Sequence, residues 1–309
     1  MITAPKLIFI DGIVGVGKSR LAQRLWLHLR KSGADAEWFA EPQSNHPLHD
    51  LGDLSNLEFP AALDRVFQAW HDFVADRRGT GRITLLDATL LQTAVRFLRA
   101  FNIPQPEWRA ILEGVLQTAE PLSPVLIYLR PKGLDGFMEQ LAEVRGAEWA
   151  GHMETMFAGI GGLTGLKAHY AERLAQDLAL IDGLLPSITL ITDRGGWNER
   201  YAAACVFLGI ETPEPPDSYS GDLALLVDHY REPESGVSWE LGISDGRLGF
   251  PSGDQPHLIH LEDTRFVLEG RPIEALFMLD AGGRAACLRF SGQLRDDPLL
   301  GTEWYRVVR

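Results

Sequence analysis

The chain has 309 residues, and its 42 acidic against 29 basic side chains give a formal net charge of −13 at pH 7. A charge this negative argues against broad contact with nucleic acid or an anionic membrane, so a phosphate site has to be a local basic spot. With 45% apolar and 23% charged residues, the composition is ordinary for a globular protein of one large or two smaller domains.

Two cysteines, Cys205 and Cys287, lie far apart and have no His or Cys neighbours at metal-ligand spacing. We therefore expect a reduced, cytoplasmic protein without a zinc site. No run of about 18 apolar residues occurs, so the sequence predicts no membrane span. The early apolar run LIFI is too short for a signal peptide and predicts a first strand.

Five short apolar runs predict β-strands, at residues 7–10, 36–42, 83–89, 124–129 and 187–193. Helical patterns separate these runs, among them a long one over residues 59–77. Strands that alternate with helices predict a parallel sheet covered on both faces. The helical stretch 133–185 is interrupted at 158–167 by AGIGGLTGLK, whose four glycines predict a hinge or loop.

The composition changes near residue 210. The segment ETPEPPDSYSGD, residues 211–222, contains three prolines and four acids and predicts an interdomain linker. Beyond it, short strand-like runs such as VSWELGIS, HLIHL and IEALFMLD follow one another closely, which predicts an antiparallel meander or half-barrel. We predict an α/β domain over 1–210 and a small β domain over 223–309.

Residues 12–19 read GIVGVGKS and satisfy the pattern GxxxxGK[ST] between a predicted strand and a predicted helix. Glycines let backbone N–H groups turn toward one centre, and the helix N-terminus adds partial positive charge. Lys18 is expected to reach the β- and γ-phosphates and Ser19 to place its hydroxyl on Mg²⁺. The sequence thus predicts a site for ATP and Mg²⁺, with the nucleotide bound by Gly12, Val14, Gly15, Val16, Gly17, Lys18, Ser19 and Arg20.

Acids also stand at the ends of the second and third predicted strands. Ligands bind at the carboxyl ends of parallel strands, so Glu41 could take a proton from an acceptor hydroxyl, and Asp87 could hold Mg²⁺ together with Ser19. Gln92, just past Asp87, could hydrogen-bond the acceptor. The alternatives are a solvated Glu41 before Pro42, and an Asp87 that caps the next helix.

The P-loop, the Glu-Pro dipeptide about two dozen residues after Lys18, the aromatic helix 59–77 and the strand-three acid come in a familiar order. Together they resemble the thymidylate kinase and deoxynucleoside kinase branch of P-loop kinases, over roughly residues 5–210. The P-loop is the specific part of this likeness, and the other motifs are short. The resemblance implies a P-loop NTPase fold with a five-stranded parallel sheet in the order 2-3-1-4-5, and a mobile lid over the phosphates.

The resemblance also implies roles on the acceptor side. Glu41 would act as base or anchor the acceptor, and Phe67 and Trp70 of the aromatic helix would line the acceptor pocket. An aromatic stripe at helical spacing is equally typical of a core. The family usually has Arg directly after the strand-three acid, whereas this chain has Ala88. The acceptor therefore stays open between nucleosides, nucleotides and other small alcohols such as antibiotics.

On the donor side, the resemblance implies that a lid arginine stabilises the transferring phosphoryl group. Arg145 is the first candidate, and Lys167 and Arg173 are weaker ones. Arg145 stands between acids, so a salt bridge is the alternative. The loop after the fifth strand would hold adenine, which places Arg194 at the nucleotide.

The C-terminal part loosely resembles the lipocalin-like domain appended to some serine hydrolases, through its Asp-Gly-Arg-Leu turn (245–248) and the run Asp-Thr-Arg-Phe (263–266). We expect an enzyme that transfers a phosphoryl group from ATP to a small molecule, with Lys18, Glu41, Asp87 and Arg145 as catalytic residues. The alternative is a nucleotide-driven switch whose β domain binds a partner. We expect neither nucleic acid nor a membrane as a partner, and the sequence leaves open whether the chain forms a homodimer.

Overall fold

The structure is a computed structural model. It describes residues 5–41, 43–48, 51, 54, 56–193, 195–211, 219–244, 246–250, 257–292, 294 and 297–307. The chain forms two compact units over these residues: Met1–Glu41 with Pro47–Pro213, and Pro42–His46 with Glu214–Arg309. Most of the predicted linker, residues 212–218, lies outside the described residues.

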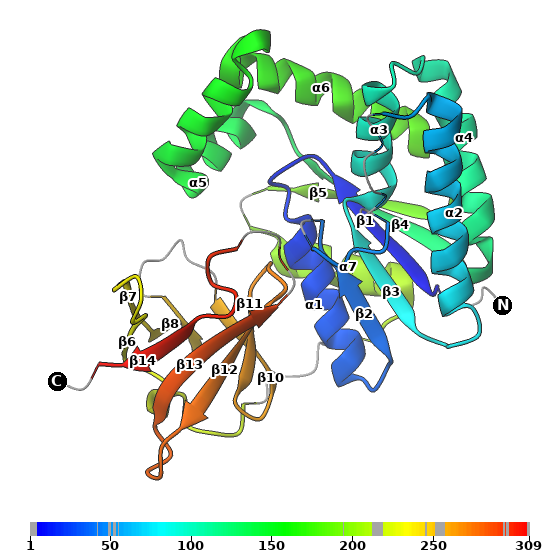
Figure 1. Cartoon of the computed structure of the whole chain (residues 1–309). Helices are drawn as coiled ribbons and strands as arrows, with labels where there is room; N and C mark the ends of the chain where they lie inside the picture. Colours follow the sequence, from blue (N-terminus) through cyan, green and yellow to red (C-terminus); the bar gives the residue numbers. More distant parts are fainter. Residues whose placement is uncertain are drawn as a thin grey trace. The chain divides into compact units, whose positions relative to one another are not determined.

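In the described part of the first unit, five parallel strands form one sheet in the order β2-β3-β1-β4-β5 (Figure 1). Their bounds are β1 (Leu7–Gly12), β2 (Ala36–Phe39), β3 (Ile83–Asp87), β4 (Pro124–Pro131) and β5 (Ser187–Thr192). The sheet class and its order confirm the predicted fold. Because β1 is the central strand and is buried along its whole length, the P-loop that follows it opens at the middle of the carboxyl edge.

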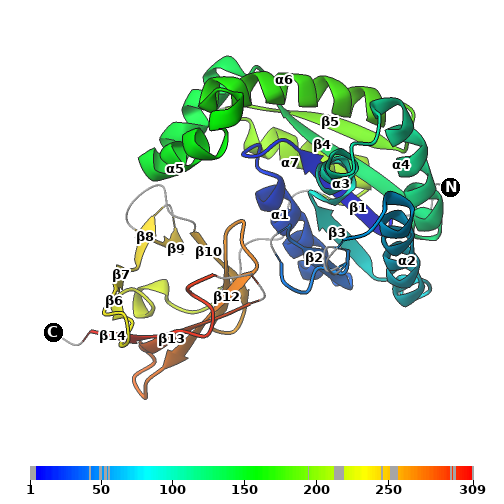
Figure 2. The ribbon, with the colours of Figure 1, turned by 45° about the horizontal axis from the view of Figure 1, so that its top comes forward.

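Helices cover both faces of this sheet (Figures 1 and 2). They are α1 (Lys18–Lys31), α2 (Phe59–Arg77), α3 (Ala94–Ala100), α4 (Gln105–Ala119), α5 (Asp135–Met156), α6 (Gly162–Ile181) and α7 (Trp197–Leu208). The helix predicted over 59–77 is thereby confirmed.

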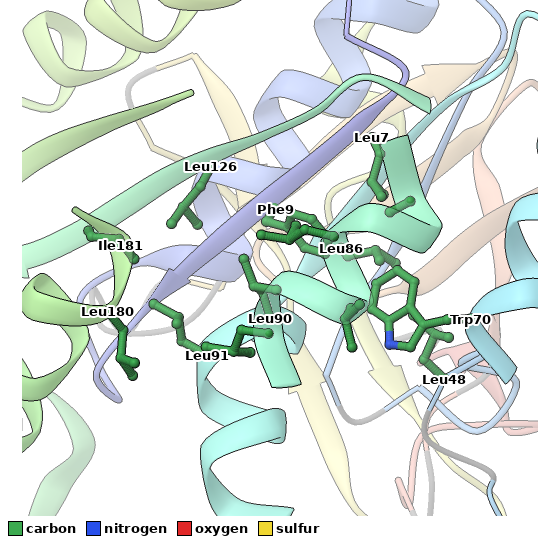
Figure 3. Close-up of a cluster of buried hydrophobic side chains, with 14 of the residues drawn as sticks. Leu7, Phe9, Leu48, Trp70, Leu86, Leu90, Leu91, Leu126, Leu180 and Ile181 are labelled. Carbon is green, nitrogen blue, oxygen red and sulfur yellow. The ribbon is translucent and has the colours of Figure 1, made fainter. Parts of the chain in front are cut away.

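Two hydrophobic cores flank the sheet because side chains alternate along each strand. Leu7 and Phe9 of β1 face a core built with α2, α3 and α4, and Figure 3 shows Trp70 of α2 in this cluster. Ile8 and Ile10 face the other core, which α1 and α7 complete. The result is a three-layer arrangement of helices, sheet and helices.

Short turns join several of these elements. A π-helical turn, η1 (Thr89–Thr93), leads from β3 into α3, and 3₁₀ turns occur at Glu120–Leu122, Ala158–Ile160 and Leu223–Leu225.

The glycine-rich interruption predicted at 158–167 is shorter than expected. α6 already begins at Gly162, because Gly161 and Gly162 adopt positive φ angles and turn the chain tightly. A Cβ on Gly165 would lie 1.7 Å from the carbonyl oxygen of Ile160, so this glycine permits close packing of the turn on α6. A second break occurs inside α5 at Gly146, whose φ of 83° and ψ of 170° are not helical.

In the described part of the second unit, nine strands form an antiparallel sheet in the order β7-β6-β14-β13-β12-β11-β10-β9-β8. They are β6 (His229–Arg231), β7 (Ser238–Glu240), β8 (Gly242–Ser244), β9 (Arg247–Gly249), β10 (His257–Glu262), β11 (Arg265–Leu268), β12 (Ile273–Leu279), β13 (Ala285–Gly292) and β14 (Glu303–Arg306).

The run VSWELGIS, predicted as one strand-like segment, contributes to both edges of this sheet. β7 and β8 are separated by Leu241 alone, whose side chain is buried and whose N–H donates to the carbonyl of Asp228. The two edge strands are therefore consecutive in the chain, and the sheet curls into a nearly closed barrel around an aromatic core that includes stacked Trp239 and Trp304.

Substitution of glycine by alanine should destabilise the protein at Gly12, where a Cβ has no room, but not at a glycine with open space around it. Gly12 has a φ of 142°, and a Cβ there would lie 2.1 Å from the carbonyl oxygen of Leu129 on β4. We expect Gly12→Ala to lower the free energy of unfolding by roughly 3 kcal/mol or more. Gly151→Ala, in the exposed interior of α5 with open space around it, should instead raise it by about 0.5–1 kcal/mol. Urea denaturation measures both, and equal stabilities of the two variants would contradict the constraint at Gly12.

Candidate functional site

The P-loop begins at the end of β1 and closes on the first turn of α1. Gly15 and Gly17 have φ angles of 86° and 91°, values that side-chain-bearing residues rarely adopt. The Lys18 ammonium is buried and donates to the carbonyl of Ile13 at 3.0 Å, within the loop itself. The loop thus surrounds a buried positive charge at a helix N-terminus, which is a suitable place for an anion.

Ser19 and Asp87 meet beside this loop. The Ser19 hydroxyl donates to Oδ2 of Asp87, which ends the neighbouring strand β3. Burial raises the pKa of the Asp87 carboxyl to about 7, although the Lys18 charge and the Ser19 hydrogen bond pull it down. Its other oxygen, Oδ1, is buried and has no hydrogen-bond partner among the described residues.

This pair of oxygen donors fits Mg²⁺. The described residues contain no group of three or more His, Cys, Asp or Glu side chains that could hold a metal ion on their own. Mg²⁺ is usually held by one or two protein oxygens together with water and substrate phosphates. The unsatisfied Oδ1 of Asp87 supplies a position for such a cation, because a buried carboxylate oxygen without a partner is costly.

Glu41 and Gln92 meet close to Asp87. The Gln92 side-chain amide donates to Oε1 of Glu41 at 2.7 Å, and the Arg96 guanidinium lies 3.7 Å from the same oxygen. The negative charge of Glu41 contributes to the raised pKa of Asp87. The structure therefore brings Lys18, Ser19, Asp87, Glu41 and Gln92 into one neighbourhood at the carboxyl edge of the sheet.

A cavity of about 520 Å³ opens on the other side of the P-loop. Residues of the P-loop, the ends of β4 and β5, and the first turns of α5 and α7 line it, among them Gly17, Arg20, Gln140, Asp193, Trp197 and Arg200. Its volume lies in the range usual for small-ligand sites.

Three arginines lie close to the Trp197 ring, and two of them, Arg20 and Arg200, line the cavity. The Arg20 guanidinium lies 5.1 Å from the Trp197 ring centre, and those of Arg24 and Arg200 each lie 5.8 Å away. Arg200 also donates to Asp193 at 3.0 Å and to the Gly195 carbonyl at 2.6 Å, which holds the loop after β5 against α7. These contacts fix an aromatic ring and several positive charges next to the P-loop.

The remaining predicted residues are Phe67, Trp70, Arg145 and Arg194. Trp70 is buried in the core with its ring 5.9 Å from that of Phe9, and the Phe67 ring packs against Gly114 of α4. Arg145 is exposed on α5, and it does not line the cavity. Arg194 is outside the described residues.

The two weaker lid candidates have acidic partners. Lys167 pairs with Asp135, and Arg173 pairs with Asp177 at 2.6 Å. Arg173 is largely buried beneath the site, where Tyr128 also donates to Asp177.

Trp197 and Arg200 of the cavity were not predicted from the sequence, and neither were Arg96 and Asp11. Arg96 follows Gln92 by one helical turn, so the spacing itself could have indicated it. Asp11 is completely buried at the end of β1 and accepts hydrogen bonds from the backbone amides of Gly12, Leu91 and Gln92. The only sequence signal for Asp11 is an acid inside an otherwise apolar strand.

No protein-family model matches the chain, and no curated protein matches it. Among solved structures, the chain is similar to the signal recognition particle receptor FtsY from Elizabethkingia anophelis, with 13% identity and a TM-score of 0.27. The match covers 61% of this chain and spans half the length of that receptor. A likeness this weak adds nothing to the fold, which rests on the sheet order. Among the described helices, none is long and apolar enough to cross a membrane.

The raised pKa of Asp87 predicts a pH-dependent stability. The folded protein holds the Asp87 proton up to about pH 7, whereas the unfolded chain releases it near pH 3.8, so stability falls as pH rises between these values. Asp87→Asn removes this cost. We expect the stability of the ligand-free variant relative to the native chain to increase by about 1–3 kcal/mol from pH 5 to pH 8.

Denaturant titrations of the Asp87→Asn variant at both pH values measure the effect. Asp72→Asn, at an exposed carboxylate on α2 that accepts from Gln68, serves as the control and should show no such divergence. A parallel pH dependence of the native chain and Asp87→Asn would show that Asp87 is not the group responsible.

Proposed function

We propose that the first unit binds Mg²⁺ and ATP and transfers the γ-phosphoryl group to a hydroxyl or phosphate of a small molecule. The observation that carries this proposal is the convergence of Lys18, Ser19, Asp87 and Glu41 at the carboxyl ends of β1, β2 and β3. A nucleotide switch needs the first three of these groups. A kinase also needs a group that orients the acceptor. The Glu41 carboxylate, which Gln92 holds beside the other three groups, suits this role.

Each residue has a separate task in this proposal. Lys18 and the P-loop amides hold the β- and γ-phosphates, for which the ammonium exchanges its bond to the Ile13 carbonyl for a phosphate oxygen. Ser19 and Asp87 hold Mg²⁺, which supplies charge neutralisation at the phosphates when bound. Glu41 orients the acceptor hydroxyl or takes its proton. Most of the catalysis comes from positioning and charge, so few reactive side chains are needed.

We place the base of the nucleotide in the cavity beside Trp197. The cavity borders Gly15–Gly17 directly, and a Cβ on Gly17 would lie 3.9 Å from the Trp197 ring. A base can therefore reach this ring while its phosphates remain in the loop. The indole offers an apolar face for stacking, and the surrounding arginines offset the negative charge of the phosphates.

Substitution of Trp197 tests the place of the base. Stacking of a base on an aromatic ring contributes about 1–3 kcal/mol, so Trp197→Ala should weaken ATP binding roughly 5- to 100-fold. Trp26→Ala is a matched control, because Trp26 also contacts an arginine, Arg30 at 5.3 Å, and does not line the cavity. Titration calorimetry with ATP and Mg²⁺ measures both variants. Equal losses in the two would indicate a general effect on folding and contradict this placement.

ADP release tests the reaction itself. The native chain is incubated with ATP and Mg²⁺, with and without nucleosides, nucleoside monophosphates, aminoglycosides and other small alcohols. We expect turnover that depends on one class of acceptor. Lys18→Ala should abolish it through lost phosphate binding, and Glu41→Gln should lower it about 10²- to 10⁴-fold while ATP still binds.

The two variants distinguish the kinase from the alternative. Tight ATP binding with ADP release that no acceptor stimulates, and that Glu41→Gln leaves unchanged, would contradict the kinase and favour a nucleotide-driven switch. Failure of the native chain to bind ATP at all would contradict both.

A further inference from the structure

The Asp11 carboxylate joins two segments that lie 80 positions apart in the chain. Its Oδ1 accepts from the amide of Gly12 at 3.0 Å and from that of Gln92 at 3.2 Å, and its Oδ2 accepts from the amide of Leu91 at 2.7 Å. Gly12 is the first residue of the P-loop, and Leu91 and Gln92 lie in the turn η1 after β3. One buried side chain therefore ties the P-loop to this turn.

The turn η1 depends on a cap from elsewhere in the chain. It starts after Ala88, which has the left-handed φ of 57°, and the residue in the N-cap position provides no side-chain hydrogen bond. The first N–H groups of a helical turn lack partners within it, and a negative charge is favoured there. Asp11 supplies both the acceptor atoms and the charge from the neighbouring strand.

The turn and the strand end just before it present the two side chains that face the two halves of the proposed reaction. Asp87 precedes it and bonds to Ser19 on the phosphate side, and Gln92 within it bonds to Glu41 on the acceptor side. A shift of η1 would displace the Gln92 contact directly, and it would act on Asp87 through Ala88, the single residue between Asp87 and the turn. π-Helical turns are frequently found at functional sites.

We propose that Asp11 is a positioning residue that holds Asp87 in place for Mg²⁺ and Gln92 in place for Glu41, without touching nucleotide or metal. The proposal rests on the function proposed above for Asp87 and Glu41. The hydrogen bonds that carry it belong to the protein alone and can be measured without any ligand.

Asp11→Asn tests this role in the full chain. The substitution replaces one carboxylate oxygen by an NH₂ group, which cannot accept from the amides of η1. In the ligand-free protein, we expect hydrogen exchange at the Leu91 and Gln92 amides to accelerate at least tenfold. In calorimetry with ADP, we expect the gain in affinity on adding Mg²⁺ to fall about 10- to 100-fold, as is typical when a residue that orients a metal ligand is removed. Affinity for ADP without Mg²⁺ should change much less, because Lys18 is unchanged and Gly12 is the one P-loop residue that bonds to Asp11 among the described hydrogen bonds.

Asp177→Asn is the matched control. Asp177 is also buried and also has a raised pKa through burial, but it binds Tyr128 and Arg173 and makes no contact with η1 among the described hydrogen bonds. It should lower thermal stability and leave both the exchange at Leu91 and Gln92 and the Mg²⁺ effect intact. If Asp11→Asn does not fold, Asp11→Ser replaces it, since a smaller side chain places no extra amide donor against the turn.

Unchanged hydrogen exchange at the Leu91 and Gln92 amides would overturn the positioning role. An unchanged gain in ADP affinity on adding Mg²⁺, measured on the folded variant, would overturn it as well. Loss of stability in Asp11→Asn with a normal Mg²⁺ effect would make Asp11 structural only and overturn it equally. If the native chain binds no ADP at any Mg²⁺ concentration, the proposed function fails instead, and the exchange rates still decide whether Asp11 holds the turn.

Discussion

Two carboxylates and one ammonium, all nearly inaccessible to water, determine how the carboxyl edge of the central sheet is built. Asp11 and Asp87 end the paired strands β1 and β3, where Ile10 is in register with Asp87. Each would repel the other if both were ionised, and burial raises the pKa of both. The buried Lys18 acts on both carboxyls in the opposite sense, lowering their pKa values. A P-loop lysine is thus also one of the charges that offset two adjacent buried acids, and Arg173 acts on Asp11 in the same sense.

Asp11 and Asp87 differ in the hydrogen-bond partners of their carboxylate oxygens. Backbone amides surround Asp11 and satisfy both of its oxygens, so it serves as a structural acceptor. Asp87 receives the Ser19 hydroxyl on one oxygen, and the other has no partner among the described residues. Buried polar groups are satisfied with few exceptions, so an unsatisfied one calls for an explanation, and a missing ligand is one such explanation. This asymmetry distinguishes Asp11 from Asp87, the acid proposed above to hold Mg²⁺.

The sequence reveals the parts of the fold and site that depend on local patterns. Glycine spacing and the strand before it locate the P-loop, and the alternation of apolar runs with helical patterns predicts the parallel sheet. Contacts distant in sequence carry no such signal. The role of Asp11 depends on amides 80 positions away, and the division of VSWELGIS depends on the closure of the barrel at Leu241. The aromatic helix was ambiguous because helical spacing is the same for a core and for a pocket wall, and the core position of Trp70 follows only from its packing against Phe9.

The surroundings of Ala88, the residue after Asp87, restrict which side chains fit at this position. Ala88 is fully buried in a left-handed conformation, and its carbonyl accepts from both the amide and the hydroxyl of Thr93. A long basic side chain at this position would have to enter the packed interior, so in the proposed kinase a positive charge beside the acceptor would have to come from another element. Arg96 of α3 has that place, 3.7 Å from Glu41 and 65% exposed. An ion pair this exposed contributes little to stability, at most about 1 kcal/mol, so in the proposed reaction Glu41 would exchange it for a bound hydroxyl at low cost.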